Sequence, residues 1–216
     1  MIDNSSLKAC LESWPRLLTR HLKRRILRSQ ANTEVEVLMP SGGCVRGYPT
    51  LEVIAGEIGD LSALKCLDLS YCGLSGELPP SLGNLTQIEY VDISYNDNIN
   101  GSIPPELGNL VILVSLNWSA NSLIGKIPSE LGFLSNLVDL DLHNNKLFGP
   151  IPFTLYHMTD LEHLYLDHNY LEGSISKNIE NFKKISFLSI TNNRFTGHIT
   201  IALCCLPTLE ILTKIK

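Results

Sequence analysis

The stretch "LEHLYLDHNYLEG", residues 161–173, contains two histidines, one aspartate and two tyrosines. His163, Asp167 and His168 are residue types that bind metals or transfer protons in catalysis. Both chemistries require side chains that converge on one point. In an extended strand His163 and Asp167 lie two pleats apart, about 13 Å. We therefore expect neither a metal site nor a catalytic centre, and the surrounding leucines must explain what positions these residues.

The leucines belong to a repeat that dominates the chain. Each unit reads approximately L-x-x-L-x-x-L-x-L-x-x-N-x-L-x-G-x-I-P-x-x-L-x-x. Successive units start 24 residues apart, with a single spacing of 25, at Leu61, Leu85, Leu110, Leu134, Met158, Phe182 and Leu206. One unit cannot bury its leucines alone, so neighbouring units must stack. We expect an irregular segment over residues 1–50 and a solenoid over residues 51–216, with six full units and a truncated seventh.

The alternation L-x-L predicts a short strand with its leucines on one face. An asparagine follows this strand in five units, where its amide can satisfy backbone groups of the turn that would otherwise be buried without a partner. These structural asparagines are Asn96, Asn121, Asn145, Asn169 and Asn193, and Cys72 takes their place in the first unit.

The motifs "LSGELPPSLGNL", "INGSIPPELGNL" and "LIGKIPSELGFL" give the units a clear likeness. They resemble plant-type leucine-rich repeats, found in the extracellular parts of receptor-like kinases, receptor-like proteins and polygalacturonase inhibitors. The resemblance implies an α/β solenoid: a right-handed superhelix with a concave parallel β-sheet and a convex side of 3-10 helices and loops. The fifth and sixth units have "GSIS" and "GHIT" where the family has a proline, so we expect less regular outer turns there.

Composition excludes several classes of function. Hydrophobic residues make up 44% of the 216 residues and charged residues 18%, enough for a core and too apolar for global disorder. Lys and Arg outnumber Asp and Glu by eight to six in residues 1–58, whereas acids outnumber bases by sixteen to nine in residues 59–216. An acidic solenoid is a poor nucleic-acid binder. We find no membrane span and no signal peptide, so the extracellular or secreted location is implied by the resemblance alone.

The ends of the chain depart from the family pattern. The basic segment "RLLTRHLKRRILR", residues 16–28, is interpreted as a solvated cap helix; a membrane-surface helix and a nuclear signal are the alternatives. The six cysteines fit neither a dense disulfide framework nor a zinc site, which leaves the redox compartment open. Neither end has the paired cysteines of the family's caps, so we expect the chain to be a fragment or a shortened gene product.

The side chains between the core leucines should form one exposed face of six strands, about 24 Å across. This face is acidic and carries aromatic residues, which suits recognition of a basic peptide or protein. The predicted ligand-binding residues are Asp92, Asp139, Asp141, His143, His163, Tyr165 and Asp167. The alternative is a strand face that is merely solvated.

Sequons for N-glycosylation lie within the solenoid at Asn84, Asn100 and Asn117. They predict a secreted glycoprotein, against the alternative of coincidence in a repeat rich in asparagine and serine. A glycan on Asn117 would stand on the concave face and block part of it.

Three functions remain open from the sequence. The first is a ligand- or co-receptor-binding ectodomain of a receptor-like kinase or receptor-like protein. The second is a secreted polygalacturonase-inhibitor-like defence protein, and the third an intracellular scaffold or truncated gene product. No nucleotide-binding, kinase, hydrolase or zinc-protease motif is present. We therefore expect no enzymatic activity and no cofactor.

Overall fold

The computed structural model describes residues 37–38, 53–54, 56–197, 206 and 211–213. Apart from two residues of strand β1, the expected N-terminal segment 1–50 and its basic stretch lie outside the described residues. The six full units are described almost completely, and most of the seventh is not.

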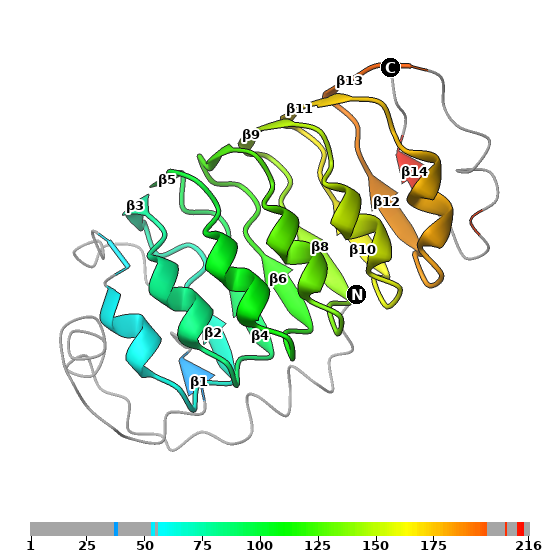
Figure 1. Cartoon of the computed structure of the whole chain (residues 1–216). Helices are drawn as coiled ribbons and strands as arrows, with labels where there is room; N and C mark the ends of the chain where they lie inside the picture. The colour runs from blue at the N-terminus through cyan, green and yellow to red at the C-terminus, as the bar shows by residue number, and fades with distance from the viewer. Residues whose placement is uncertain (1–36, 39–52, 55, 198–205, 207–210, 214–216) are drawn as a thin grey trace.

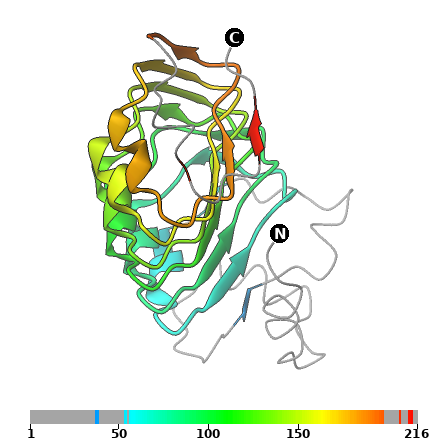
Figure 2. The same cartoon turned by 90° about the vertical axis from the view of Figure 1, so that its right-hand side faces the viewer.

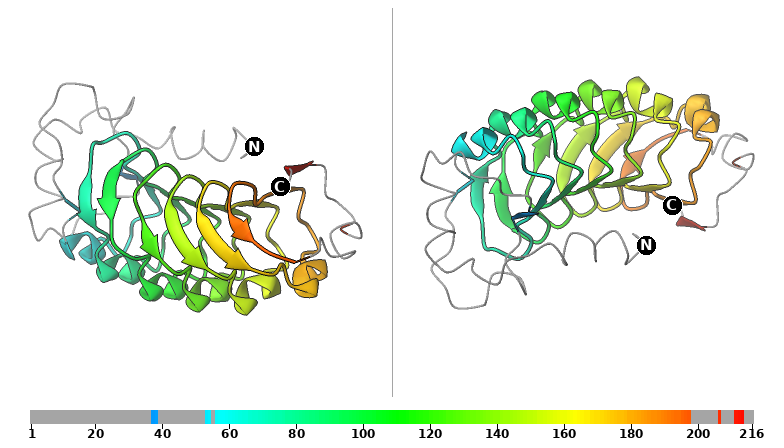
Figure 3. Two further views of the ribbon diagram at one scale, coloured as in Figure 1. Left: turned by 90° about the horizontal axis from the view of Figure 1, so that it is seen from above. Right: turned by 90° about the horizontal axis from the view of Figure 1, so that it is seen from below.

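The units stack into an arc whose inner side is an eight-stranded parallel sheet (Figure 1, Figure 3). Each unit contributes one strand of three residues, because the L-x-L core continues only until the chain turns outward. The strands in spatial order are β1 (Val37–Leu38), β2 (Cys66–Asp68), β4 (Tyr90–Asp92), β6 (Ser115–Asn117), β8 (Asp139–Asp141), β10 (His163–Tyr165), β12 (Phe187–Ser189) and β14 (Ile211–Thr213). From β2 to β12, equivalent residues of successive units pair directly.

Short 3-10 helices cover the side opposite this sheet, as the view along the stack shows (Figure 2). They are η1 (Gly56–Asp60), η2 (Pro80–Asn84), η3 (Pro105–Asn109), η4 (Ser129–Phe133), η5 (Phe153–His157) and η6 (Lys177–Asn181). Pro79, Pro104, Pro128 and Pro152 precede η2 to η5. Proline suits this position because its fixed φ favours a helix start and no N–H is lost.

The outer turn of the fifth unit keeps the helix length of the others, although it packs less closely against its neighbour. Its "GSIS" lacks the proline, yet η6 has five residues like the others. Ser176 replaces proline by capping: its backbone is extended, and its hydroxyl accepts a hydrogen bond from the N–H of Asn178 at 3.2 Å. The "GHIT" of the sixth unit lies mostly outside the described residues.

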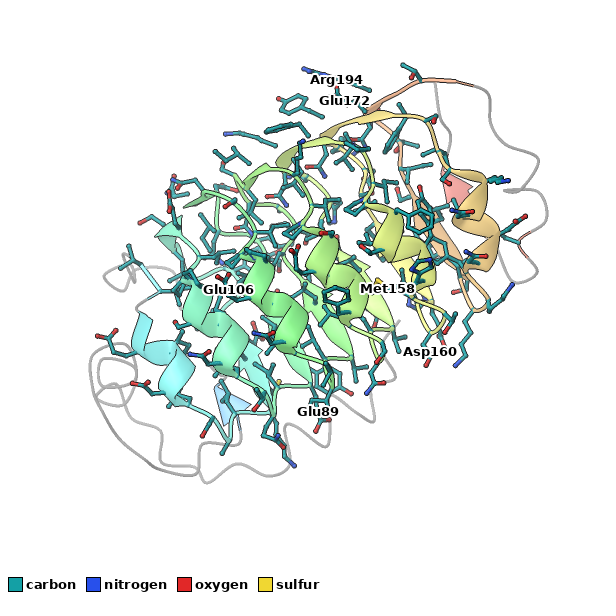
Figure 4. The ribbon with its side chains drawn as sticks, in the orientation of Figure 1. Glu89, Glu106, Met158, Asp160, Glu172 and Arg194 are labelled. Carbon is teal, nitrogen blue, oxygen red and sulfur yellow. The ribbon has the colours of Figure 1, made fainter. Side chains whose placement is uncertain are left out.

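Additional short strands line the lateral edge between the concave sheet and the helices. They are β3 (Ser75–Glu77) with β5 (Asn98–Asn100), and β7 (Ile124–Gly125), β9 (Lys146–Gly149), β11 (Tyr170–Gly173) and β13 (Arg194–Phe195). Glu172 and Arg194 mark this edge in Figure 4, and Glu89 and Asp160 mark the opposite one. The repeat pattern did not predict these strands.

The core is a continuous column of leucine and isoleucine between the two layers. The structural asparagines form a row beneath the sheet that ties neighbouring units together. This row is called the asparagine ladder below, and Cys72 holds the ladder position of the first unit. The Oδ1 of Asn145 accepts from the N–H of Leu123 in the preceding unit at 3.0 Å, and its Nδ2 donates to the carbonyls of Trp118, Leu142 and His143. Asn96, Asn121, Asn169 and Asn193 bond in the same manner. Burial without these bonds would leave several backbone groups unpaired at each unit.

Candidate functional site on the concave face

All seven predicted ligand-binding residues lie on the concave sheet and are half-buried. Strand pairing brings six of them together, because β8 lies beside β10 with Asp139 opposite His163 and Asp141 opposite Tyr165. Asp92 lies two strands away on β4, separated by β6. The six residues on and directly after β8 and β10 (Asp139, Asp141, His143, His163, Tyr165 and Asp167) are called the acidic cluster below.

The expected face is less exposed than its pattern predicts. Ser94, Ser115, Ser119 and Ser189 belong to the same columns, but all four are buried. Their short side chains lie among longer neighbours, and the hydroxyl of Ser119 donates to Oδ1 of Asn117 at 2.7 Å. The accessible part of the face is therefore formed by its long polar and aromatic side chains.

Each histidine of this region is paired with an aspartate. His143 and Asp141 are 2.7 Å apart (Nδ1 to Oδ1), and His163 bonds to Asp139 across the two strands. His168, just beyond β10, places Nδ1 2.8 Å from Oδ2 of Asp167. Its Nε2 lies 2.7 Å from Nδ2 of Asn192. Because Asn192 can only donate from that nitrogen, His168 must carry its proton on Nδ1. The pairs fix the ring orientations and leave the carboxylates with oxygen atoms for a ligand.

The electrostatics of the acidic cluster follow from this pairing. The hydrogen bond to Asp141 raises the pKa of His143 above its usual value; burial opposes the shift, and the charges of Asp141 and Asp167 add to it. Burial pushes the pKa of Asp167 upward, but hydrogen bonds from Ser189 and His168, with the charge of His143, outweigh it and hold that pKa low. Asp167 thus carries a full negative charge at neutral pH.

Aromatic surface adjoins these charges. The rings of Tyr165 and Phe187 lie 4.6 Å apart between centroids, at 31° to each other. Burial, then the charges of Asp141, Asp139 and Asp167, raise the pKa of the Tyr165 hydroxyl. That group therefore stays a protonated donor beside three carboxylates, which is suitable for a polar ligand with an apolar portion.

A second feature of the face was missed by sequence reasoning. One residue per unit, directly before the ladder position, has a left-handed backbone: Tyr71, Tyr95, Ala120, Asn144, His168 and Asn192, with φ between 51° and 57°. Its N–H still donates to the next unit, as in Tyr95 to the carbonyl of Ser119 at 3.0 Å. The fixed place of this residue before the ladder asparagine was the only available signal.

Nothing in the described residues resembles a metal centre. Among these residues, no three His, Cys, Asp or Glu side chains are arranged so that they could hold one metal ion. Nor does any helix of the described part have the length and apolarity that crossing a membrane requires. Cys72, buried at the ladder position of the first unit, is disulfide-bonded.

Comparison with known proteins gives a consistent result. The leucine-rich repeat family model matches residues 63–85, 87–110, 136–158 and 160–182. The leucine-rich repeat ectodomain of the plant membrane receptor kinase GASSHO1/SCHENGEN3 from Arabidopsis thaliana, solved with CASPARIAN STRIP INTEGRITY FACTOR 2, is 33% identical with a TM-score of 0.72, covering 74% of this chain and 19% of that one. The ectodomain of the Arabidopsis receptor kinase HAESA, solved with an extended IDA peptide hormone, is 30% identical with a TM-score of 0.71, covering 73% and 26%.

A shorter relative is matched over most of its length. In the BIR3–SERK2 complex from Arabidopsis thaliana, the similar chain is 35% identical with a TM-score of 0.54, and the match covers 61% of this chain and 69% of that one. A comparison with curated proteins yields no match.

The stacked parallel strands, outer 3-10 helices and asparagine ladder define a solenoid of the kind that presents a concave surface. The chain belongs to the leucine-rich repeat family. GASSHO1/SCHENGEN3 and HAESA, two of the structures that it resembles, are ectodomains of plant receptor kinases. The chain spans 19% to 28% of the first three structures that it resembles, a fraction of their length.

Proposed function

We propose that this solenoid is a non-catalytic recognition module of a plant receptor-like kinase or receptor-like protein, and that its acidic cluster binds a basic segment of a peptide or protein ligand. The observation that carries the proposal is the gathering of three carboxylates and the Tyr165–Phe187 aromatic pair on adjacent strands. Histidines orient the carboxylates, so a ligand meets a pre-arranged site and fewer side chains lose freedom on binding.

The relatives support a binding role. GASSHO1/SCHENGEN3 and HAESA were each solved with a ligand, and HAESA also with the co-receptor SERK1. By analogy, we include a co-receptor among the partners of this chain. The basic character of the ligand is inferred from the charge of the face alone.

An extracellular location accompanies this proposal. Disulfide bonds persist in oxidising compartments, and Cys72 is disulfide-bonded. The side chains of Asn84 and Asn100, both in sequons, are exposed. These observations favour an ectodomain or a secreted inhibitor over an intracellular scaffold. An in-frame membrane span and kinase motifs in the downstream genomic sequence would separate the receptor from the inhibitor.

The test uses an array of nonapeptides in which each arginine- or lysine-containing peptide has a counterpart with citrulline or norleucine at those positions. We expect the full chain to prefer the charged member of at least some pairs. The substitutions Asp141→Ala and Tyr165→Ala should each weaken that binding roughly tenfold, which corresponds to about 1.4 kcal/mol.

Asp160→Ala is the matched control. Asp160 lies at the edge of the molecule, paired with Lys184 at 2.8 Å, and its loss changes the net charge as Asp141→Ala does (Figure 4). Equal weakening by Asp160→Ala and Asp141→Ala would mean that total charge alone attracts the peptides. That outcome, or indifference to peptide charge, contradicts the proposal.

A further inference from the structure

Two stacked tyrosines stand toward the N-terminal end of the concave face, on the units before the acidic cluster. The rings of Tyr71 and Tyr95 are nearly parallel, at 8°, with centroids 4.3 Å apart. Their exposed fractions are 60% and 45%, so both residues are accessible to solvent. They follow β2 and β4 in the row of left-handed residues, so they extend the edge of the face.

The backbone does not favour tyrosine at these positions. A left-handed φ, here 54° and 57°, suits glycine and asparagine and is unfavourable for a bulky residue. Later units place Asn144 and Asn192 at the equivalent positions. Core packing does not explain the tyrosines either, because neither ring belongs to the buried core and they stack only on each other. We infer a functional constraint from bulky residues held in this backbone conformation outside the core.

The units that carry the pair, and the unit after them, are strongly acidic in sequence. Between residues 56 and 120, Lys65 is the only lysine or arginine, against eight carboxylates: Glu57, Asp60, Asp68, Glu77, Glu89, Asp92, Asp97 and Glu106. Asp92 lies close enough to act on Tyr71. Desolvation raises the pKa of the Tyr71 hydroxyl most. The hydrogen bond with Tyr95, the charge of Tyr95 and the charge of Asp92 raise that pKa further. A cation is therefore attracted to this end of the face.

One ring face of the pair is left open by its own row. Tyr71 covers one face of Tyr95, and 45% of the Tyr95 residue surface stays exposed. The next position of the row belongs to the third unit. There the row holds Ala120, whose methyl group is too small to cover a ring and is itself buried. A flat group of the ligand can occupy the place that a longer side chain would fill.

We propose that Tyr95, with Tyr71 behind it, is a second anchor site that binds an arginine side chain of the peptide ligand by stacking. The guanidinium group is flat, positively charged and weakly hydrated, and it stacks on aromatic faces more readily than the compact ammonium group of lysine. This inference rests on the proposed function and specifies its ligand further.

The register of the sheet sets the spacing of the two anchors. The tyrosine site lies between β4 and β6 and the acidic cluster between β8 and β10, so across the sheet they are two strand spacings apart, about 10 Å at 4.8 Å per strand. Along the strands, the row of Tyr95 lies one residue beyond the column of His143 and Asp167, which is therefore the nearest part of the acidic cluster. A segment running across the strands at about 3.3 Å per residue covers that distance in three residues. The ligand should therefore carry a second basic residue three positions from its stacked arginine.

The probe is a fluorescein-labelled nonapeptide of glycine and serine with arginines at positions 3 and 6, titrated with the full chain by fluorescence anisotropy. A second peptide carries citrulline, which is flat but neutral, at both positions. We expect Tyr95→Asn to weaken binding of the arginine peptide by roughly 3- to 30-fold and to leave the citrulline peptide unchanged. Chemical denaturation should show Tyr95→Asn to be as stable as the unmodified chain or more so, because asparagine tolerates the left-handed backbone.

Tyr170→Asn is the control, since Tyr170 is also 45% exposed but lies on the lateral strand β11; it should leave binding unchanged. Unchanged binding in Tyr95→Asn with weakened binding in Asp141→Ala would overturn the anchor and keep the proposed function. Unchanged binding in both variants would overturn both. A clear loss of stability in Tyr95→Asn would make the pair a structural feature. If the chain forms a dimer that Tyr95→Asn dissociates, the tyrosine pair is occupied by a second copy of the chain. Either the loss of stability or such a dimer overturns the anchor.

Discussion

His143 links ligand binding to pH at the scale of a single residue. The hydrogen bond to Asp141 raises the pKa of His143. The ring therefore stays protonated to a higher pH than an ordinary histidine, whose pKa is about 6.5. While protonated, it cancels part of the charge of Asp141 and Asp167. We expect the affinity for the arginine peptide to rise as pH increases through the raised pKa, measured by anisotropy titrations between about pH 5.5 and 8.5.

The histidines of the neighbouring strand require a control. His163 bonds to Asp139 and His168 to Asp167, so both rings also lie beside carboxylates of the concave face. His143→Gln should flatten most of the pH dependence, whereas His168→Gln, at the more exposed edge, should preserve it. The prediction fails if His143→Gln keeps the full pH dependence.

Folding stability has the opposite pH dependence at this residue. When the pKa of a histidine is higher in the folded state than in the unfolded state, its protonation stabilises the fold. That contribution is complete at a pH below the unfolded-state pKa and is lost as the pH rises through the folded-state pKa. The bond between His143 and Asp141 thus stabilises the fold under the conditions in which the face attracts cations least. Conditions that favour binding of a basic ligand remove this contribution.

At the scale of elements, the outer helices pack so closely that glycine is required. A Cβ built on Gly108 in η3 would lie 2.6 Å from the carbonyl oxygen of Glu130 in η4. We expect Gly108→Ala to lower the free energy of unfolding by about 1–3 kcal/mol, because the two helices must separate. Urea denaturation followed by circular dichroism measures this loss.

Gly56→Ala serves as the comparison for that measurement. Gly56 begins η1, and its Cβ would meet only the hydroxyl of Ser81 at 3.9 Å, an ordinary contact. A Gly108→Ala variant as stable as Gly56→Ala would disprove the close-packing argument.

Farther along the stack the glycine is replaced. Tyr156 takes its place in η5, is buried, and lies 5.7 Å from Phe182 between ring centroids. The larger side chain explains why η6 packs less closely against η5 than the preceding helices pack against one another. The sequence shows the substitution, but its accommodation depends on the volume available between two helices.

At the scale of the whole molecule, the sequons differ in their surroundings. Asn84 and Asn100 are exposed at the end of η2 and on β5. Asn117 is half-buried: its Nδ2, the atom that would carry a sugar, donates to Asp92 at 3.0 Å, and the hydroxyl of Ser119 is buried beneath it. For chain expressed through a plant secretory pathway, we expect glycopeptide mapping to find glycans on Asn84 and Asn100 and little on Asn117.

Variants that lack the Asn84 and Asn100 sequons test whether those glycans affect ligand binding. Asn84→Gln and Asn100→Gln should leave binding of the arginine peptide unchanged, because η2 and β5 lie away from the concave sheet. An Asn117 glycan as abundant as that on Asn100 would contradict the expected difference and would block the face beside the tyrosine anchor.

The repeat alone predicted the stack and the columns of its exposed face. A unit of 24 residues with leucines at fixed positions can bury them only by stacking, so the row of short strands and the columns of Asp139 and His163 follow from spacing. The concave sheet and the convex 3-10 side were implied by the resemblance to plant-type leucine-rich repeats. The contacts between units could not be predicted, since they depend on distances across strands. Only the tertiary structure revealed that each histidine pairs with an aspartate, that the serines are buried, and that Tyr71 and Tyr95 stack on left-handed backbone. Periodicity specifies which residues share a face, whereas their contacts depend on side-chain length and backbone conformation, which vary from unit to unit.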